Sequence, residues 1–239
     1  MDELLLCRFI AALAREGLSP ATIKSYLAGV RHAQIMRGLP EPKQTGSMAR
    51  LKLVQAGVAR DRLNRGISSE DRRLPITASV LSGLISVWAT PTEASLDPAI
   101  VFDNAMLRAA ATLCFFGFFR SGEITVPSTS AFEERRHLAW GDVAVDQACP
   151  PAVVRVHLKR SKCDQLGHGV DVFVGRTGTV LCPVTAVLVY VEKRGPRPGS
   201  FFCRHDGTPL TKAFFIAKVR EALTTLGLDP RQFAGHIQF

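Results

Sequence analysis

The stretch Leu113–Thr125 reads LCFFGFFRSGEIT, an apolar run that ends on an arginine, Arg120. Such a run predicts a buried helix, and Gly117 and Gly122 mark its end. A guanidinium keeps its proton and is costly to bury without an anion or several acceptors beside it. The sequence must therefore provide Arg120 with a partner, either within the protein or in a molecule that it binds.

The patterns around this run predict an α+β domain over residues 76–239. Asp97 and Pro98 form a helix start signal, a capping side chain followed by proline in the first turn. Two segments of alternating apolar residues predict strands, and the polar segment 159–169 between them predicts a long hairpin. The expected helices and strands span 79–88, 98–118, 153–158, 170–174, 183–193 and 212–226.

The first 66 residues predict a small module made only of helices, at about 4–15, 20–37 and 47–59, from apolar positions at helical spacing. Arg60–Arg65 begins a basic connector, and residues 67–75 form a basic linker. The predicted architecture is therefore mainly α with a small antiparallel β-sheet: a helical domain over 1–66 and a second domain over 76–239.

The charge of the chain is positive and unevenly spread. The net charge is +9, and residues 1–75 hold 13 Lys and Arg against 7 Asp and Glu. This asymmetry favours a polyanionic partner, of which nucleic acid is the commonest inside cells. Charge alone would fit a solvated basic face equally well.

Composition excludes several other classes of protein. The hydrophobic fraction of 46% is that of a folded chain, and the longest apolar stretch, 109–119, is shorter than the about 20 residues that span a bilayer. Residues 1–20 do not have the pattern of a secretory signal. We therefore expect an intracellular protein without membrane association.

The six cysteines are scattered with no Cys-x-x-Cys pair, which indicates reduced thiols rather than disulfides. Cys203 and His205 with Cys163 or His168 could be imagined as zinc ligands, but structural zinc sites use tighter paired spacing. We expect neither a metal nor a cofactor.

Two further residues gain meaning from their order after Arg120. Taken singly, Arg120 could be a cation near a helix C-terminus paired with Glu123, Lys162 an exposed hairpin lysine and His236 a tail residue. Together, the segments FFRSGEI (118–124), LKRSKCDQ (158–165) and FAGH (233–236) follow a basic helical module in a fixed order. In this respect the whole chain resembles the tyrosine recombinase (phage integrase-like) family, in particular recombinases of eukaryotic mobile elements.

The resemblance implies roles for four residues in phosphodiester chemistry. A tyrosine attacking a phosphodiester passes through an anionic transition state that fixed positive donors stabilise, while an acid protonates the leaving oxygen. By resemblance, Arg120 would clamp the scissile phosphate and Glu123 would hold Arg120 in place. Lys162 would be the general acid, and His236 would act on the phosphate and nucleophile side.

The sequence departs from the family after His236. The family continues as His-x-x-Arg, a further His or Trp and a nucleophilic tyrosine, whereas Phe239 stands at the arginine position here. Both tyrosines, Tyr26 and Tyr190, fall on predicted helices away from this region. We expect a DNA-binding protein of the recombinase type that does not cleave DNA. A truncated record of an active recombinase and a helical protein-interaction module without a DNA role are the alternatives.

The expected partner is double-stranded DNA, with room for self-association on it, in the nucleus if the source is eukaryotic. Helix 20–37 would approach a groove with Lys24 and Arg31 forward. The other cations of the first part would contact phosphates, which position a protein without specifying sequence. These are Lys43, Arg50, Lys52, Arg60, Arg62, Arg65, Arg72 and Arg73.

Overall fold

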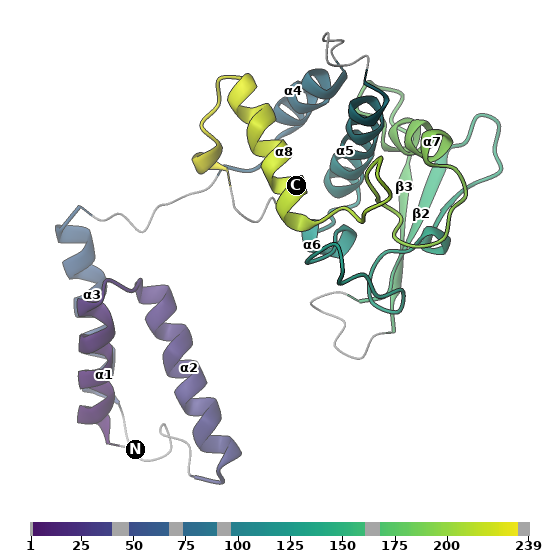
Figure 1. Ribbon diagram of the computed structural model, residues 1–239. Coiled ribbons are helices and arrows are strands. Elements are labelled where there is room, and N and C mark those ends of the chain that lie inside the picture. The colour runs from purple at the N-terminus through teal and green to yellow at the C-terminus, as the bar shows by residue number, and fades with distance from the viewer. Residues whose placement is uncertain (1, 40–47, 67–73, 90–96, 161–167, 234–239) are drawn as a thin grey trace. The chain divides into compact units, whose positions relative to one another are not determined.

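The computed structural model describes residues 2–39, 48–66, 74–89, 97–160 and 168–233. The chain divides into two compact units, Met1–Arg72 and Arg73–Phe239, and the division falls inside the predicted linker 67–75. The two units are traced in Figure 1, and each is considered by itself.

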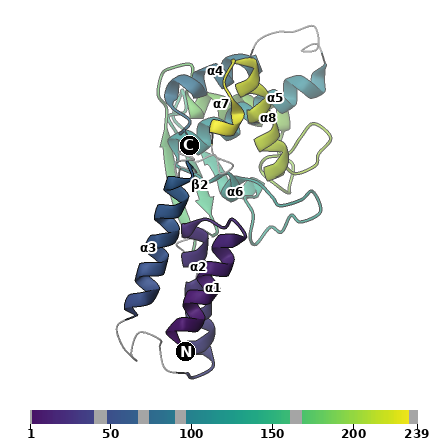
Figure 2. The ribbon, with the colours of Figure 1, turned by 90° about the vertical axis from the view of Figure 1, so that its left-hand side faces the viewer.

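Unit 1 consists of three helices, α1 (Glu3–Arg15), α2 (Pro20–Met36) and α3 (Ala49–Asn64). The Asp2 carboxylate accepts from the N–H of Leu4, and the Ser19 hydroxyl accepts from the N–H of Thr22, so both predicted helix starts are capped. Helix α1 packs against α3, and α2 contacts both, as Figure 2 shows from the side.

Helix α3 is longer than the sequence predicted, because Arg60–Asn64 continues the helix instead of beginning a connector. An ion pair of 2.9 Å between Arg65 and Asp61, one turn apart, supports this last turn. The predicted apolar face of α3 is half-buried at Leu51, Val54 and Val58. The core of the unit is small: its buried apolar side chains among the described residues are Leu6, Ile10 and Ile23.

Unit 2 combines several helices with a small antiparallel sheet on one side, so the chain has the mixed α+β class that the sequence predicted. Helix α5 packs against α7 and α4, α7 also contacts β2 and β3, and α8 packs against α4 (Figure 1). The elements of this unit are α4 (Ala78–Ala89), α5 (Pro98–Phe116), α6 (Ser121–Ile124), β1 (Val143–Val145), β2 (Val153–Leu158), β3 (Val170–Gly175), α7 (Pro183–Arg194) and α8 (Lys212–Thr225), with single 3-10 turns at Trp140–Asp142 and Pro230–Gln232.

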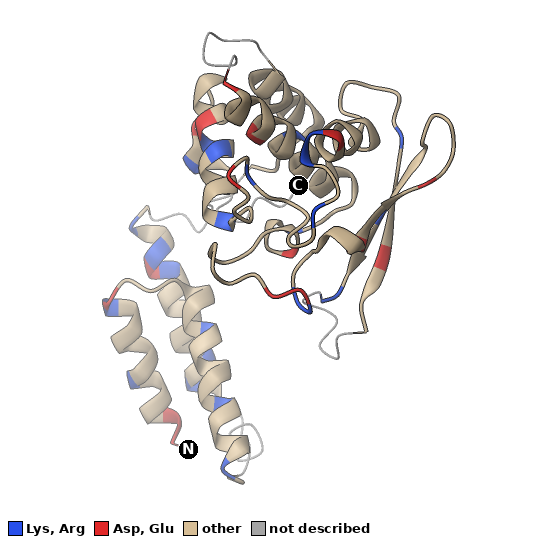
Figure 3. Cartoon of the chain, turned by 45° about the vertical axis from the view of Figure 1, so that its right-hand side comes forward, with Lys and Arg blue, Asp and Glu red and all other residues tan. Residues whose placement is uncertain are grey.

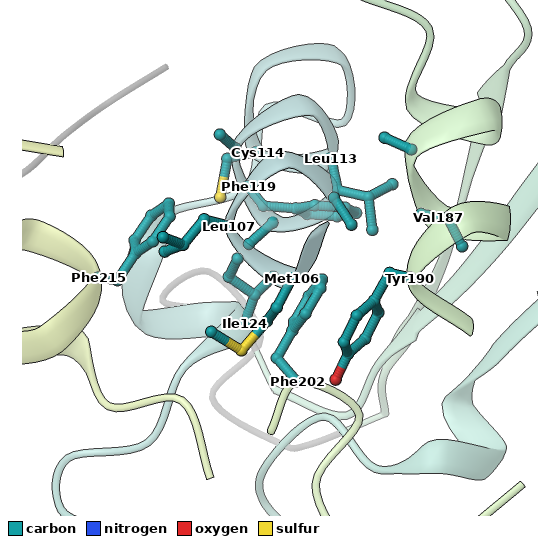
Figure 4. Packing of buried hydrophobic residues seen from close by; sticks show 14 of the residues in the cluster. Met106, Leu107, Leu113, Cys114, Phe119, Ile124, Val187, Tyr190, Phe202 and Phe215 are labelled. Carbon is teal, nitrogen blue, oxygen red and sulfur yellow. The ribbon is translucent and has the colours of Figure 1, made fainter. Parts of the chain in front are cut away.

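Helix α5 forms the centre of unit 2. Its residues Met106, Leu107 and Leu113 lie among side chains from α7 and α8 in Figure 4, where Tyr190 and Phe215 approach from either side. By length and composition alone α5 could also cross a membrane, a test that the core helices of soluble proteins pass too. The sequence predicted no membrane-spanning segment, because the longest unbroken apolar stretch, 109–119, is shorter than the helix. Polar residues such as Asp103 and Arg108 interrupt the rest of α5.

The β-hairpin forms as the alternating pattern predicted. Strands β2 and β3 pair antiparallel from Val153 with Gly175 to Leu158 with Val170. Val154, Val156 and Leu158 face the core, as every second residue of a strand must. The sequence did not predict β1, which pairs with β2, because three residues carry too little alternation to be recognised.

Candidate nucleic-acid interface

The end of helix α5 has an unusual geometry that prepares the position of Arg120. The N–H of Gly117 donates to the carbonyl of Leu113 (2.8 Å) and the N–H of Phe119 to that of Cys114 (3.1 Å), which closes the helix. Between them Phe118 has φ +54°, in the left-handed region, and the residue is 83% exposed. Gly117 is required here, since an added Cβ would lie 2.6 Å from the Phe119 ring.

Arg120 is the N-cap residue directly before α6, rather than the last cation of the long helix. Its own N–H donates to Glu123 Oε2 (2.8 Å), and its guanidinium Nη1 donates to Glu123 Oε1 (2.9 Å). The Arg120 side chain is 46% exposed and that of Glu123 only 13%. One carboxylate therefore grips both the backbone and the side chain of Arg120, which fixes the direction of a guanidinium that still faces solvent.

Arg120 and Glu123 lie in an open cleft of about 410 Å³. Leu158 and Val172 of the hairpin form its other wall, and Phe118 completes the lining with Gly117 and Phe119. The end of helix α5 and the strands β2 and β3, which are far apart in the sequence, thus meet at this cleft. A guanidinium oriented by a carboxylate in an open cleft is suited to bidentate recognition of a phosphate or carboxylate.

Of the four residues that the resemblance nominated, the structure brings Arg120 and Glu123 together. Lys162 and His236 lie outside the described residues. Leu158, four residues before Lys162, lines the same cleft as Arg120. The strand that leads toward the predicted general acid therefore borders the Arg120 cleft.

The predicted DNA contacts within residues 24–73 differ in environment. Arg62, predicted to contact a phosphate, is half-buried and donates to the carbonyl of Gly17 (3.2 Å), a contact that links the end of α3 to the turn after α1. Arg65 pairs with Asp61. Lys43, Arg72 and Arg73 lie outside the described residues. The remaining cations are exposed on the helices: Lys24, Arg31, Arg50, Lys52 and Arg60. Blue segments in Figure 3 recur along these helices.

Tyr190 is built into the core of unit 2. Its hydroxyl donates to the carbonyl of Phe201 (2.9 Å) and accepts from the N–H of Cys203 (2.9 Å). Burial raises the pKa of Tyr190 well above its ordinary value. A phenol that is buried, hydrogen-bonded and hard to ionise is a structural group.

Cys203 and His205, two of the possible zinc ligands, make contacts within the core and with Asp103 instead. His205 packs edge-on against the Phe102 ring (centroids 5.8 Å apart), and its backbone N–H donates to Asp103 Oδ1 (2.8 Å). Cys203 is buried beside Tyr190. Within the described ranges no group of three or more His, Cys, Asp or Glu side chains is placed to hold a metal ion.

Sequence reasoning missed two features of this region. Phe118 gave no signal, because an aromatic residue within an apolar run is expected to be buried. A second, basic cleft lies beside the hairpin and includes Arg135, Arg136 and Arg160. The arginine pair at 135–136 was visible in the sequence, but only the fold brings it near Arg160.

No protein-family model matches this chain, and no curated protein sequence matches it.

Proposed function

We propose that this protein binds double-stranded DNA in the manner of the tyrosine recombinases, with Arg120 on a backbone phosphate, and that it does not itself cleave the strand. The observation that carries the proposal is the pair of hydrogen bonds by which Glu123 holds the backbone and the guanidinium of Arg120 at an open cleft. The bond to the backbone N–H is the capping-box contact of α6, and the second bond, to the guanidinium, gives the exposed side chain a fixed direction. Holding the guanidinium in one direction lowers the entropy lost when an anion binds.

Charge and shape support a polyanion as the ligand. The excess of cations in residues 1–75 and the exposed Lys24, Arg50 and Lys52 give unit 1 a surface to which phosphates are attracted. The exposed Phe118 ring stands at the rim of the Arg120 cleft, where it offers an aromatic face to the bound nucleic acid. Strained backbone held at a site of this kind is common where a side chain must be presented for binding.

The surroundings of the tyrosines support the absence of cleavage. The Tyr190 oxygen is buried and has two backbone partners, so a phosphate cannot reach it without unfolding the core. Tyr26 is 51% exposed on α2, the helix that also carries Lys24. In this proposal Tyr26 belongs to the DNA-contacting surface and not to a catalytic group.

Binding is tested with a fluorescent duplex of mixed sequence by anisotropy at several salt concentrations. We expect affinity to fall with salt, with a log–log slope of about −0.9 per phosphate contacted. Arg120→Gln should make the slope shallower by about one unit. Lys193→Gln is the matched control, because Lys193 is an exposed cation of the same unit, at the end of α7. Absence of duplex binding by the wild-type protein at low salt would favour the protein-interaction alternative.

Cleavage is tested separately with a nicked suicide duplex, on which a recombinase becomes trapped. We expect no band that survives denaturing electrophoresis. A covalent protein–DNA adduct would refute the non-cleaving part of the proposal, and its loss in Tyr26→Phe would identify the nucleophile.

A further inference from the structure

The second cleft of unit 2, of about 600 Å³, has a markedly basic lining. Four of its side chains are cations and one is a carboxylate, Glu133, and two histidines complete the polar wall. The cationic members are Arg135, Arg136, Lys159 and Arg160. A concave surface with this balance attracts anions more strongly than the same charges spread on a flat surface.

Lys159 holds the cleft together and is not available as a ligand. Its Nζ lies 2.6 Å from Asp142 Oδ2 and also donates to the carbonyls of Glu134 and His137. Its side chain is mostly buried, and Asp142 is fixed in turn by the N–H of Ala139 (2.7 Å). The two carbonyl bonds of Lys159 therefore attach the loop that carries Arg135 and Arg136 to the end of strand β2.

The fastened loop is also closed by its own hydrogen bonds. The N–H groups of Arg136 (3.0 Å) and His137 (2.9 Å) both donate to the Glu133 carbonyl, and the Glu133 N–H donates to His137 Nδ1. The turn therefore presents its arginines in a fixed arrangement, which reduces the ordering cost of binding.

Two of the cations carry no compensating charge within the part of the chain that the structure describes. Arg135 and Arg160 are exposed and make neither an ion pair nor a hydrogen bond through their side chains there. Arg136 has only a loose contact with Glu133 (3.6 Å), and both of those side chains are more than half exposed. Such a pair contributes little and can be replaced by a stronger anion.

The basic cleft is distinct from the Arg120 cleft. His157 lines the basic cleft and Leu158 lines the Arg120 cleft. Because consecutive residues of a strand point to opposite faces, the two clefts flank opposite faces of β2. Asp171, the strand partner of His157, is already bound to His157 (2.7 Å) and lies near Arg155 (3.6 Å), so its carboxylate does not fill the basic cleft.

We infer that this basic cleft is a second phosphate-binding site, in which Arg135 and Arg160 bind a phosphate group, with Arg136 joining them when it leaves Glu133. The inference rests on the proposed function for its natural ligand, a backbone phosphate of the same DNA. The chemistry of the cleft would also suit a free polyphosphate, and the two experiments below separate these sources. In either case the site binds phosphate oxygens and does not read bases.

The DNA experiment compares the double variant Arg135→Gln/Arg160→Gln with Lys193→Gln/Arg220→Gln, which removes two exposed cations of the same unit from α7 and α8. The cleft variant should make the salt slope shallower by about 1–2 units, and the control by less. Adding Arg120→Gln to the cleft variant should make the salt slope shallower still, because the two clefts bind different phosphates. If duplex binds the wild-type protein but the cleft variant equals the control, the inference is overturned while the proposed function stands.

The second experiment does not depend on DNA binding. Inorganic pyrophosphate is titrated into the full chain at low salt by calorimetry. We expect binding that is lost in Arg135→Gln/Arg160→Gln and kept in both Arg120→Gln and the control. Pyrophosphate binding without duplex binding would keep the cleft as a polyphosphate site and reject the proposed function. Equal titrations for the cleft variant and the wild type would overturn the inference.

Discussion

Replacing Phe118 by glycine tests the geometry on which the Arg120 cleft is built. A non-glycine residue in the left-handed region costs about 1–2 kcal/mol, and Phe118 has φ +54°. Phe118 is 83% exposed, so removing its ring forfeits only a small part of the about 1.5–3 kcal/mol that a fully buried phenylalanine contributes. Glycine in turn adds about 0.5–1 kcal/mol of chain entropy to the unfolded state.

The clean comparison is between Phe118→Gly and Phe118→Ala, because both lack the ring and only alanine keeps the strained φ. The costs above leave the glycine variant more stable than the alanine variant by about 0.5–1 kcal/mol. With a urea m-value of about 2–3 kcal/mol/M, this corresponds to a midpoint higher by about 0.2–0.5 M.

Tryptophan fluorescence is the suitable assay, since both tryptophans of the chain, Trp88 and Trp140, belong to unit 2. Equal urea midpoints for the two variants, or a lower one for glycine, would refute the left-handed conformation of Phe118. Duplex affinity adds a functional reading: if the ring contacts DNA, both variants bind more weakly than the wild type although one of them is more stable.

Three other predictions concern separate parts of the chain. Tyr190→Phe should lower the free energy of unfolding by about 1–3 kcal/mol, because it leaves the N–H of Cys203 and the carbonyl of Phe201 buried without their partner, and duplex binding below the unfolding midpoint should not change. Arg50→Ala with Lys52→Ala should flatten the salt dependence of duplex binding by about two units if both contact phosphates, and an unchanged slope would remove them from the interface. Burial acts to raise the pKa of Cys182, but hydrogen bonds from Thr185 and nearby backbone N–H groups lower it to about 6. A pKa that is lower in the folded state stabilises the fold above the ordinary thiol pKa, and this stabilisation is lost as pH falls through about 6. The free energy of unfolding of the wild type should therefore rise relative to that of Cys182→Ala between about pH 6 and pH 9. Parallel curves of unfolding free energy against pH would contradict this.

The helices and the hairpin could be predicted because their signals are local. Ser19 before Pro20 and Asp97 before Pro98 each cap a helix that starts where the sequence indicated. The alternation in 153–158 places Val154, Val156 and Leu158 toward the core through the two-residue period of a strand. The predicted pairing of Arg120 with Glu123 also formed, because three residues of separation bring the two side chains together at a helix start.

What surrounds Arg120 could not be predicted in the same way. The walls of its cleft come from the end of α5 and from β2 and β3, which meet only when the sheet and helices pack. Phe118 is exposed because the closure of α5 turns the backbone there into a left-handed conformation, and hydrophobicity alone would have placed the ring inside.

The sequence by itself determined the class of the elements, the basic character of the chain and the partner that grips Arg120. Only the tertiary structure decided that Arg62 supports a helix, that Tyr190 is sealed in the core, and that Arg135 and Arg160 share one cleft. The physical reason is the range of the interactions. Caps, periodicity and one-turn ion pairs act over a few residues, whereas burial and the gathering of like charges depend on chain segments that are distant in sequence and adjacent only after folding.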